Sequence, residues 1–443
     1  MSDRDTARHA LAEVYFAGVD ISKSLRPYLL SLSYTDNEED ETDDLQIKIE
    51  DRDGTWLRKW LDVSVHDAIE GGGASSASGG SGYTVTAKSG LNIRSGPGTS
   101  YSKYGAFAYG AAVSVQEISG GWAKISYNGK TAYVAAEYLK AEGGGSSGSD
   151  GTGAAVDKVK GLSIQAAILR CNWNGDGKDT MLNCGQFELD SVQASGPPNT
   201  IAIKATSLPY SSTIRQMKKS KAWEGYYLSG IAGEMAGAAG MAVIYESGND
   251  PYYDRVEQIT QTDITFLQTL CHNAGLSLKV ANNILVLFDQ ADYEKKDAVF
   301  TIAYGSTGYT KWRLNTGEAE VKYTSCRVSY TKPSGEVVQG TAYVEDYKSN
   351  DDNNQCLEIT AAVANAGEAK ALAEKKLREH NKFELTAAFT LPGNPALTAG
   401  RTVMLRGWGM WNGKYMIKQA KHTVDGSGGY TTQISLRRVL EGY

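Results

Sequence analysis

Histidine and cysteine carry much of the nucleophilic and metal-binding chemistry of proteins, and this chain has few of either. The histidines are His9, His66, His272, His380 and His422. The cysteines are Cys171, Cys184, Cys271, Cys326 and Cys356. No HExxH run occurs, and no GxSxG, Walker or GxGxxG loop stands between an expected strand and an expected helix. We therefore expect no catalytic residue, no cofactor and no metal, and interpret the chain as a non-enzyme.

Cys271 and His272 are neighbours in sequence and could suggest a nucleophile beside its base. On a helix, adjacent side chains diverge by about 100°, which is a poor geometry for that pair. We interpret them as a buried thiol beside an exposed histidine. Hydrolysis of a cell wall would otherwise need two carboxylates that meet in space, and the spacing of the acidic residues marks no such pair.

One short run imitates a calcium loop. Its residues at positions 1, 3, 5 and 6 of an EF-hand are Asn172, Asn174, Asp176 and Gly177. Position 12 would be Asn183, where the EF-hand needs a bidentate glutamate. The flanking residues alternate as strands do, so a hairpin turn is favoured over a calcium site. Cys171 and Cys184 stand at the two ends of this hairpin and are candidates for cross-strand neighbours, with free thiols.

Residues 36–44, DNEEDETDD, form an acidic run between two expected strands. Such a run is either a solvated loop or a cation site, and we favour the solvated loop.

Composition excludes several classes of protein. The 443 residues carry a net charge of −6, with a pI near 5.6, so no basic footprint predicts specific nucleic-acid binding. No apolar run is long enough to cross a bilayer, so no membrane insertion is expected. The polar residues 1–9 lack the apolar core of a signal peptide, which predicts synthesis and folding in the cytoplasm.

Period-two alternation predicts strands over much of residues 14–65, again from 162 to 206, and in the last third of the chain. Helical spacing predicts three helices, at residues 228–238, 263–273 and 367–381. The chain is therefore expected to be mainly β with α+β parts.

Two Gly/Ser-rich runs, residues 71–82 and 141–159, enclose a segment with its own strands and turns, residues 83–140. Asn128-Gly129 within it is a strong hairpin signal. Strand alternation resumes after the second run, so we interpret the segment as an insert. The predicted domains are 1–70 plus 160–206 (a discontinuous β-barrel), 83–140 (the insert), 207–300 (α+β) and 301–443 (a second β-barrel with one helix).

The insert resembles bacterial SH3 (SH3b) domains. GLNIRSGPGTSY at residues 90–101, GWAKI at 121–125 and GKTAYV at 129–134 carry the resemblance. It implies a small barrel that binds peptidoglycan or only protein. The candidate groove residues are Arg94, Tyr101, Tyr104, Trp122 and Tyr133. The alternative is that Trp122 and Tyr133 belong to the barrel core.

The rest of the chain resembles the late-control protein D family, the baseplate hub of contractile phage tails and of phage-tail-like bacteriocins (tailocins). The stretches that carry the resemblance, in order, are DLQIKIEDR (44–52), CGQFELD (184–190), SGPP (195–198), KAWE (221–224), DRV (254–256), FLQ (266–268), GKY (413–415) and LRRVLEGY (436–443). The insert is the departure from the family pattern.

That resemblance implies two tail-tube-like β-barrels per chain and a homotrimer that matches a sixfold tube. The implied partners are the tail tube or tube-initiator protein, the central spike protein, baseplate wedge proteins and the tape-measure protein, with peptidoglycan as a ligand of the insert. The product would be assembled into a phage tail or tailocin baseplate and released by lysis. A peptidoglycan-binding or peptidoglycan-degrading tail lysin is the alternative function, and a free-standing adhesin conflicts with the missing secretion signal. Phage or headless bacteriocin, the target bacterium and the orientation of the insert are all left open by the sequence.

Overall fold

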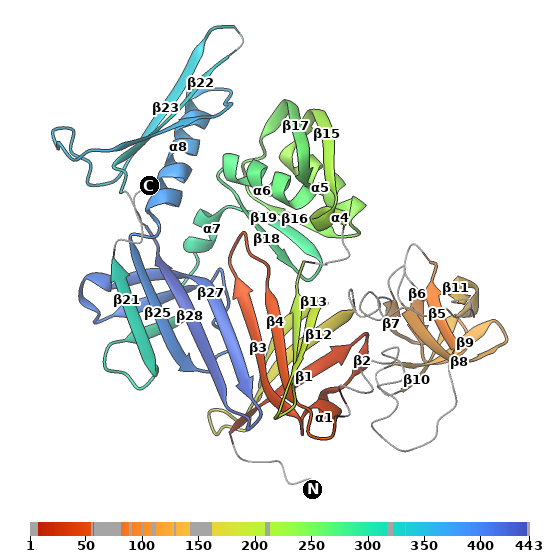
Figure 1. The fold of residues 1–443 in the computed structure, drawn as a ribbon. Helices are drawn as coiled ribbons and strands as arrows, with labels where there is room; N and C mark the ends of the chain where they lie inside the picture. The colour runs from red at the N-terminus through yellow and green to blue at the C-terminus, as the bar shows by residue number, and fades with distance from the viewer. Residues whose placement is uncertain are drawn as a thin grey trace. The chain divides into compact units, whose positions relative to one another are not determined.

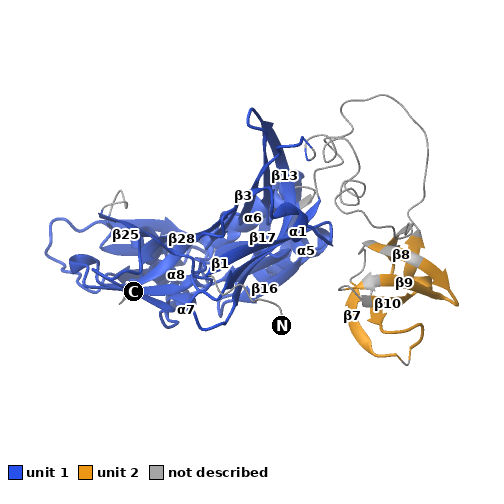
Figure 2. Ribbon diagram, turned by 90° about the horizontal axis from the view of Figure 1, so that it is seen from below, with its two compact units in different colours: residues 1–69, 154–443 blue, residues 70–153 orange. Residues whose placement is uncertain are grey.

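The structure is a computed structural model. It describes residues 8–54, 56, 81–87, 91–99, 101–107, 112–127, 130–141, 162–208, 213–316, 322–332 and 334–440. The chain divides into two compact units, one of residues 1–69 with 154–443 and one of residues 70–153 (Figure 2). Strands predominate in both, so the prediction of a mainly β protein with α+β parts is confirmed.

A large sheet runs through the first unit (Figure 1). Within the described residues it has thirteen strands, eleven of them in the order β2-β1-β12-β13-β14-β4-β3-β27-β28-β25-β21. The strands of its first half are β1 (His9–Phe16), β2 (Val19–Asp20), β3 (Leu29–Asn37), β4 (Asp44–Glu50), β12 (Ser163–Cys171), β13 (Thr180–Ser195) and β14 (Thr200–Thr206). Alternation explains them: Leu45, Ile47 and Ile49 of β4 are buried while the residues between them are not. A four-residue helix, α1 (Ser22–Leu25), follows β2.

Strands from the two sides of the insert pair with each other. β1 runs antiparallel to β12, with register from His9↔Cys171 to Phe16↔Ile164. β14 pairs in the same way with β4. Residues before and after the insert therefore build one sheet, while the predicted domain limits stay a prediction.

Cys171 and Cys184 do not face each other. A bulge in the β12–β13 pair falls between Ala166 and Ala167, and Cys184 lies opposite that step. Cys171 lies opposite His9 on β1. The cross-strand prediction is thus wrong, while all five thiols are free, as expected.

The second half of the sheet is built from the end of the chain. Its strands are β20 (Phe300–Ala303), β21 (Lys311–Thr316), β25 (Leu385–Pro392), β26 (Thr402–Arg406), β27 (Gly413–Asp425) and β28 (Tyr430–Arg438). A short 3-10 helix, η3 (Gly409–Trp411), joins β26 to β27. Two indoles from this connection close the barrel: Trp408 Nε1 donates to Ile302 O of β20, and Trp411 Nε1 donates to Asn315 O of β21.

Residues 213–294 form an α+β part with its own core. Its elements are α4 (Thr213–Gln216), β15 (Lys218–Tyr227), α5 (Leu228–Ala238), β16 (Ala242–Glu246), β17 (Tyr252–Thr262), α6 (Asp263–Asn273), β18 (Ser277–Ala281), β19 (Ile284–Phe288) and α7 (Gln290–Glu294). The predicted helices α5 and α6 are confirmed. Thr262 caps α6 by accepting a hydrogen bond from Thr265 N, and Gly275 follows its end with a positive φ of 64°.

A three-stranded sheet lies against the longest described helix. The elements are β22 (Ser325–Thr331), β23 (Val337–Tyr343), β24 (Cys356–Thr360) and α8 (Ala366–Asn381), which confirms the predicted helix. A Cβ added to Gly340 would lie 2.2 Å from Lys370 N, so a glycine is needed where β23 approaches α8. None of the helices in the described part of the chain is long and apolar enough to cross a membrane.

The second unit is a small β-barrel. Its described strands are β5 (Ser81–Val85), β6 (Leu91–Arg94), β7 (Lys103–Phe107), β8 (Ala112–Ser119), β9 (Trp122–Tyr127), β10 (Lys130–Ala135) and β11 (Leu139–Ala141), with a 3-10 helix η2 (Ala136–Tyr138) before the last. β9 and β10 form an antiparallel hairpin. The predicted turn residues Asn128 and Gly129 lie outside the described residues.

One buried guanidinium ties the large sheet to its neighbours. Arg437 of β28 is 1% exposed. Its Nη2 donates to Glu38 Oε1 at 2.7 Å, and its Nη1 donates to Glu294 Oε1 at 2.5 Å. Burial raises the pKa of the Glu38 carboxyl, and the charge of Arg437 opposes that rise.

Replacing Arg437 by alanine leaves Glu38 and Glu294 buried without their shared cation. We expect R437A to lower the free energy of unfolding by about 3–5 kcal/mol, measured by urea denaturation. The matched control is R438A, since Arg438 is half-buried and donates to Met410 O. A loss in R437A no larger than that in R438A would contradict the assigned role.

Candidate functional site

Arg94 is the residue that shapes the loop after β6. Its Nη1 donates to Thr99 O at 2.7 Å and to Tyr101 O at 2.9 Å. A Cβ on Gly96 would lie 2.4 Å from Tyr101 Cδ1, so the glycine leaves room for the aromatic ring. Arg94 therefore fixes the loop that presents Tyr101, which is 49% exposed.

Trp122 and Tyr133 lie on the outer face of the barrel. Their strand neighbours Ala123, Ala132 and Val134 are buried in the core, and side chains alternate along a strand. Tyr133 is opposite Lys124 on β9 and opposite Arg94 on β6. Residues directly opposite share a face, so Arg94, Tyr133 and Lys124 form one row across three strands.

Trp122 lies diagonally from that row, since it is opposite Ala135, two residues after Tyr133. We call Arg94, Tyr101, Trp122, Lys124 and Tyr133 the aromatic face. Both Trp122 and Tyr133 are half-buried, and neither belongs to the buried core cluster of the unit. The alternative that these two side chains form the barrel core is therefore not supported.

The structure brings four of the five predicted groove residues together and places the fifth beside them. Tyr104 is exposed on β7, at the bulge opposite the step from Ile93 to Arg94. Sequence reasoning missed Lys124, although the alternation in GWAKI places it on the same face as Trp122. Aromatic rings beside a fixed loop and a lysine can hold an amphipathic ligand with a negative charge.

The expected solvated loop at residues 36–44 is wrong for four of its nine residues. Asp36, Asn37, Glu38 and Asp43 are buried, at the tip of the β3–β4 hairpin. Lys279 Nζ of β18 donates to Asp36 Oδ1 at 2.5 Å and lies 3.5 Å from Asp43 Oδ1. Burial raises the pKa of Asp43 to about 7, and Lys279 opposes this rise. The carboxylates are buried because cations from distant segments reach them.

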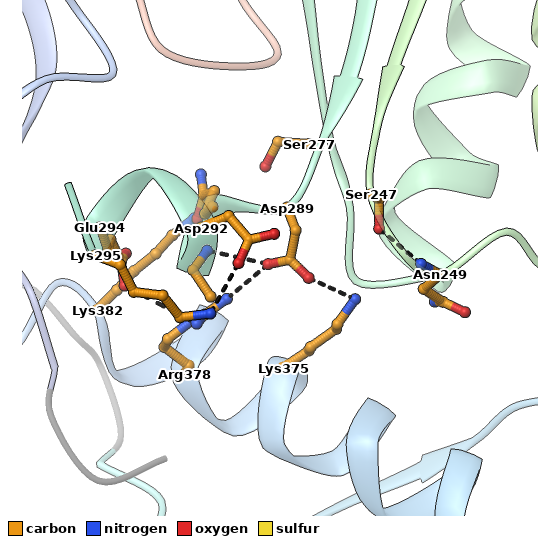
Figure 3. A network of polar contacts seen from close by, with 12 residues as sticks. Ser247, Asn249, Ser277, Asp289, Asp292, Glu294, Lys295, Lys375, Arg378 and Lys382 are labelled. Carbon is orange, nitrogen blue, oxygen red and sulfur yellow. Dashed lines mark hydrogen bonds and ion pairs between the residues drawn. The ribbon is translucent and has the colours of Figure 1, made fainter.

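The network continues through α7 and α8 (Figure 3). Asp289 caps α7 by accepting from Ala291 N. Its carboxylate also forms an ion pair with Lys375 Nζ at 2.8 Å and accepts from Arg378 Nη2 at 3.4 Å. Lys382 Nζ donates to Glu39 Oε1 at 2.6 Å. The hairpin tip, α7, α8 and β28 are thereby connected by ion pairs.

His272 joins the same hairpin tip from α6. Its Nε2 lies 3.1 Å from Asp40 Oδ2, and its Nδ1 lies 3.0 Å from Glu379 Oε1. The hydrogen bonds to Asp40 and Glu379 raise the pKa of His272 to about 10, against the effect of burial. Burial acts to raise the pKa of Glu379, but the hydrogen bonds and charges of His272 and Lys376 outweigh it, so that this pKa falls to about 2. His272 is therefore an imidazolium that clamps two carboxylates.

Cys271 and His272 do not form an activated nucleophile and base. Burial raises the pKa of the Cys271 thiol to about 12, and the neighbouring His272 is held by carboxylates. A groove of about 640 Å³ beside the clamp is lined by charged and polar residues of the hairpin tip, α8 and β27. No group of three histidine, cysteine or acidic side chains among the described residues could hold a metal ion.

The calcium-like run is a hairpin turn, as predicted. Asn172 Oδ1 accepts from Gly177 N, and Asp176 Oδ1 accepts from Lys178 N. Those side-chain oxygens thus stabilise the backbone of the turn between β12 and β13.

The His272 clamp predicts a pH window for stability. Its folded pKa is above the unfolded value of 6.5, so its contribution is complete below pH 6.5 and is lost as the pH rises toward 10. We expect the urea midpoint of the wild type to fall between pH 6.5 and 10 by more than that of H272Q. H380Q, which removes a histidine without this clamp, should keep the wild-type slope. Equal slopes for the wild type and H272Q would contradict the assignment.

Comparisons with known proteins agree with this division of the chain. Residues 89–140 match the family model described as bacterial SH3 domain. A 112-residue match, 40% identical, was found to the putative N-acetylmuramoyl-L-alanine amidase YrvJ of Bacillus subtilis. It spans 25% of this chain and only 20% of the amidase, and it covers the SH3 region.

Two solved structures share the fold of nearly the whole chain. The tail protein from Neisseria meningitidis MC58 aligns with a TM-score of 0.56 and 9% identity, over 97% of each chain. The 43 kDa tail protein of prophage MuSo2 from Shewanella oneidensis aligns with a TM-score of 0.54 and 11% identity, over 97% of this chain and 98% of that one. The chain thus has the fold of phage tail proteins and carries within it a bacterial SH3 domain at residues 89–140.

Proposed function

We propose that the protein is the structural baseplate hub of a contractile phage tail or phage-tail-like bacteriocin. The observation that carries this proposal is the shared fold with two tail proteins over 97% of the chain. A continuous sheet that supplies two barrel-like halves per chain suits a subunit that joins a tube to a spike. In this proposal the chain forms a homotrimer and contacts the tail tube or tube-initiator, spike, baseplate wedge and tape-measure proteins.

The aromatic face gives the hub a second role, as a cell-wall binder. It lies on a unit with its own core, attached at both ends through Gly/Ser-rich sequence. The relative that matches this region is named for the amide bond of peptidoglycan. We propose that the SH3 domain binds peptidoglycan and that the chain itself does not cleave it.

Electron cryo-microscopy of the particle that contains this chain tests the hub role. We expect three copies around the tail axis, between the tube and the spike, each presenting two barrel-like halves to the tube. One copy per particle, or six equivalent copies, would contradict the proposal.

Sedimentation with purified cell walls tests the SH3 role. The wild type should pellet with the walls, and W122A/Y133A should lose about 10- to 100-fold in affinity, because stacking aromatics supply about 1–3 kcal/mol. The matched control is Y138A, which removes an exposed aromatic from η2 of the same unit.

Unchanged binding of W122A/Y133A would contradict the aromatic face, and absence of wild-type binding would leave a protein ligand for the domain. Release of soluble wall fragments would instead establish the tail-lysin alternative.

A further inference from the structure

The end strand β21 carries exposed aromatic area. Trp312 on β21 is 50% exposed, and Tyr304, just after β20, is 63% exposed. Both rings pack edge-on against the buried Trp408, at centroid distances of 5.3 Å and 5.0 Å. Met410, in the same connection as Trp408, is exposed as well. We call Tyr304, Trp312 and Met410 the Trp312 patch.

The charged residues that lie near this patch in sequence are all basic. Residues 298–316 and 385–424 contain no aspartate or glutamate, in a chain whose net charge is −6. Lys311 and Arg313 flank Trp312, and Arg406 ends β26 beside β20. All three are exposed, and none forms an ion pair with a carboxylate of the described residues. Because side chains alternate along a strand, Lys311 and Arg313 project from the face of β21 opposite to Trp312. The strand is thus bordered by an aromatic ring on one face and by two cations on the other.

The backbone of β21 adds hydrogen-bonding N–H and C=O groups to this surface. β21 pairs with β25 on one side and ends the described path of the sheet on the other. Trp411 Nε1 reaches Asn315 O, so that carbonyl points away from β25. Because every second residue of a strand points its N–H and C=O to the same side, the backbone N–H and C=O groups of Lys311 and Arg313 face the same open edge as the Asn315 carbonyl.

The other end of the sheet has the opposite charge. Residues 9–22 contain Glu13 and Asp20 but no lysine or arginine. Between these carboxylates lies Tyr15 of β1, 37% exposed and opposite Asp20 of β2. Asp20 lies opposite Tyr15, and Glu13 lies two residues before it on the same face of β1. The charge of Asp20, then burial and the charge of Glu13, raise the pKa of Tyr15. We call Glu13, Tyr15 and Asp20 the Tyr15 flank.

We propose that the Trp312 patch of one copy binds the Tyr15 flank of the next copy, head to tail. β21 and β2 are the two ends of the strand path, and Figure 1 shows them at opposite ends of the sheet. One sheet therefore presents at its two ends surfaces of opposite charge, each with an exposed aromatic side chain. Two different surfaces in contact generate a closed ring when the rotation between copies closes. The inference rests on the homotrimer of the proposed function and names the surfaces that hold it together.

Charge reversal with rescue tests the contact in the full chain, using mass photometry across a dilution series. K311E/R313E and E13K/D20K should each weaken the oligomer about 100-fold, because each sets like charges against one another. The quadruple variant carries both reversals and should recover most of the wild-type association. The matched control for charge is K178E/K348E, which changes two exposed lysines outside both surfaces by the same amount and should associate as the wild type does.

Circular dichroism of each variant establishes that the fold is retained. Recovery in the quadruple variant supports the pairing. An oligomeric wild type that neither reversal weakens, or a quadruple variant that stays dissociated, overturns the pairing and leaves the hub proposal standing. A wild type that stays monomeric at every concentration overturns both the pairing and the homotrimer.

Discussion

Buried carboxylates at the tip of the β3–β4 hairpin impose the strongest constraint on this structure. An ionised carboxylate out of water costs several kcal/mol unless a cation and hydrogen bonds meet it. Asp36 meets Lys279 and the N–H of Ala399, and Glu38 meets Arg437. These partners come from β18, the connection before β26, and β28, which lie 240–400 residues further along the chain. The hairpin can therefore be buried only when the α+β part and the second barrel are both in place, which makes the unit cooperative.

That cooperativity explains how the chain accommodates an inserted domain. The chain leaves the large sheet after β4 and returns at β12, and neither strand depends on a residue of the insert for its register. The inserted barrel has its own core, built from Val85, Ile93, Ile125, Val134 and their neighbours. None of the ion pairs at the hairpin tip involves it. A domain can therefore be carried there without altering the ion pairs that hold the large unit together, and its binding can vary independently.

Sequence reasoning succeeded where the determining interactions are local. Alternation predicted the strands, and helical spacing predicted the helices. Sequence reasoning failed where the interacting residue is remote in sequence. The acidic run was interpreted as a solvated loop because no residue near Glu38 in sequence indicates that Arg437 pairs with it. The prediction that Cys171 and Cys184 are cross-strand neighbours failed because a bulge shifts the register of β12 against β13. At the SH3 domain the sequence nominated Arg94 as a groove residue, but only its contacts to Thr99 and Tyr101 reveal that it supports the loop.

The indoles of the β26–β27 connection stabilise the second barrel at the strand edge that we propose for assembly. Trp408 and Trp411 use their N–H groups on carbonyls of β20 and β21, so the barrel is closed by side chains where the edges of the two strands do not pair. These hydrogen bonds satisfy some backbone groups at the strand edges and leave others without a strand partner. An unpaired strand edge normally favours aggregation because it can pair with a strand of another chain. Here Lys311 and Arg313 lie along that edge, and charged side chains on an edge strand disfavour its pairing with another strand. In the proposed contact between copies the same two side chains meet the carboxylates of the Tyr15 flank, so the residues that protect the free subunit also select its partner.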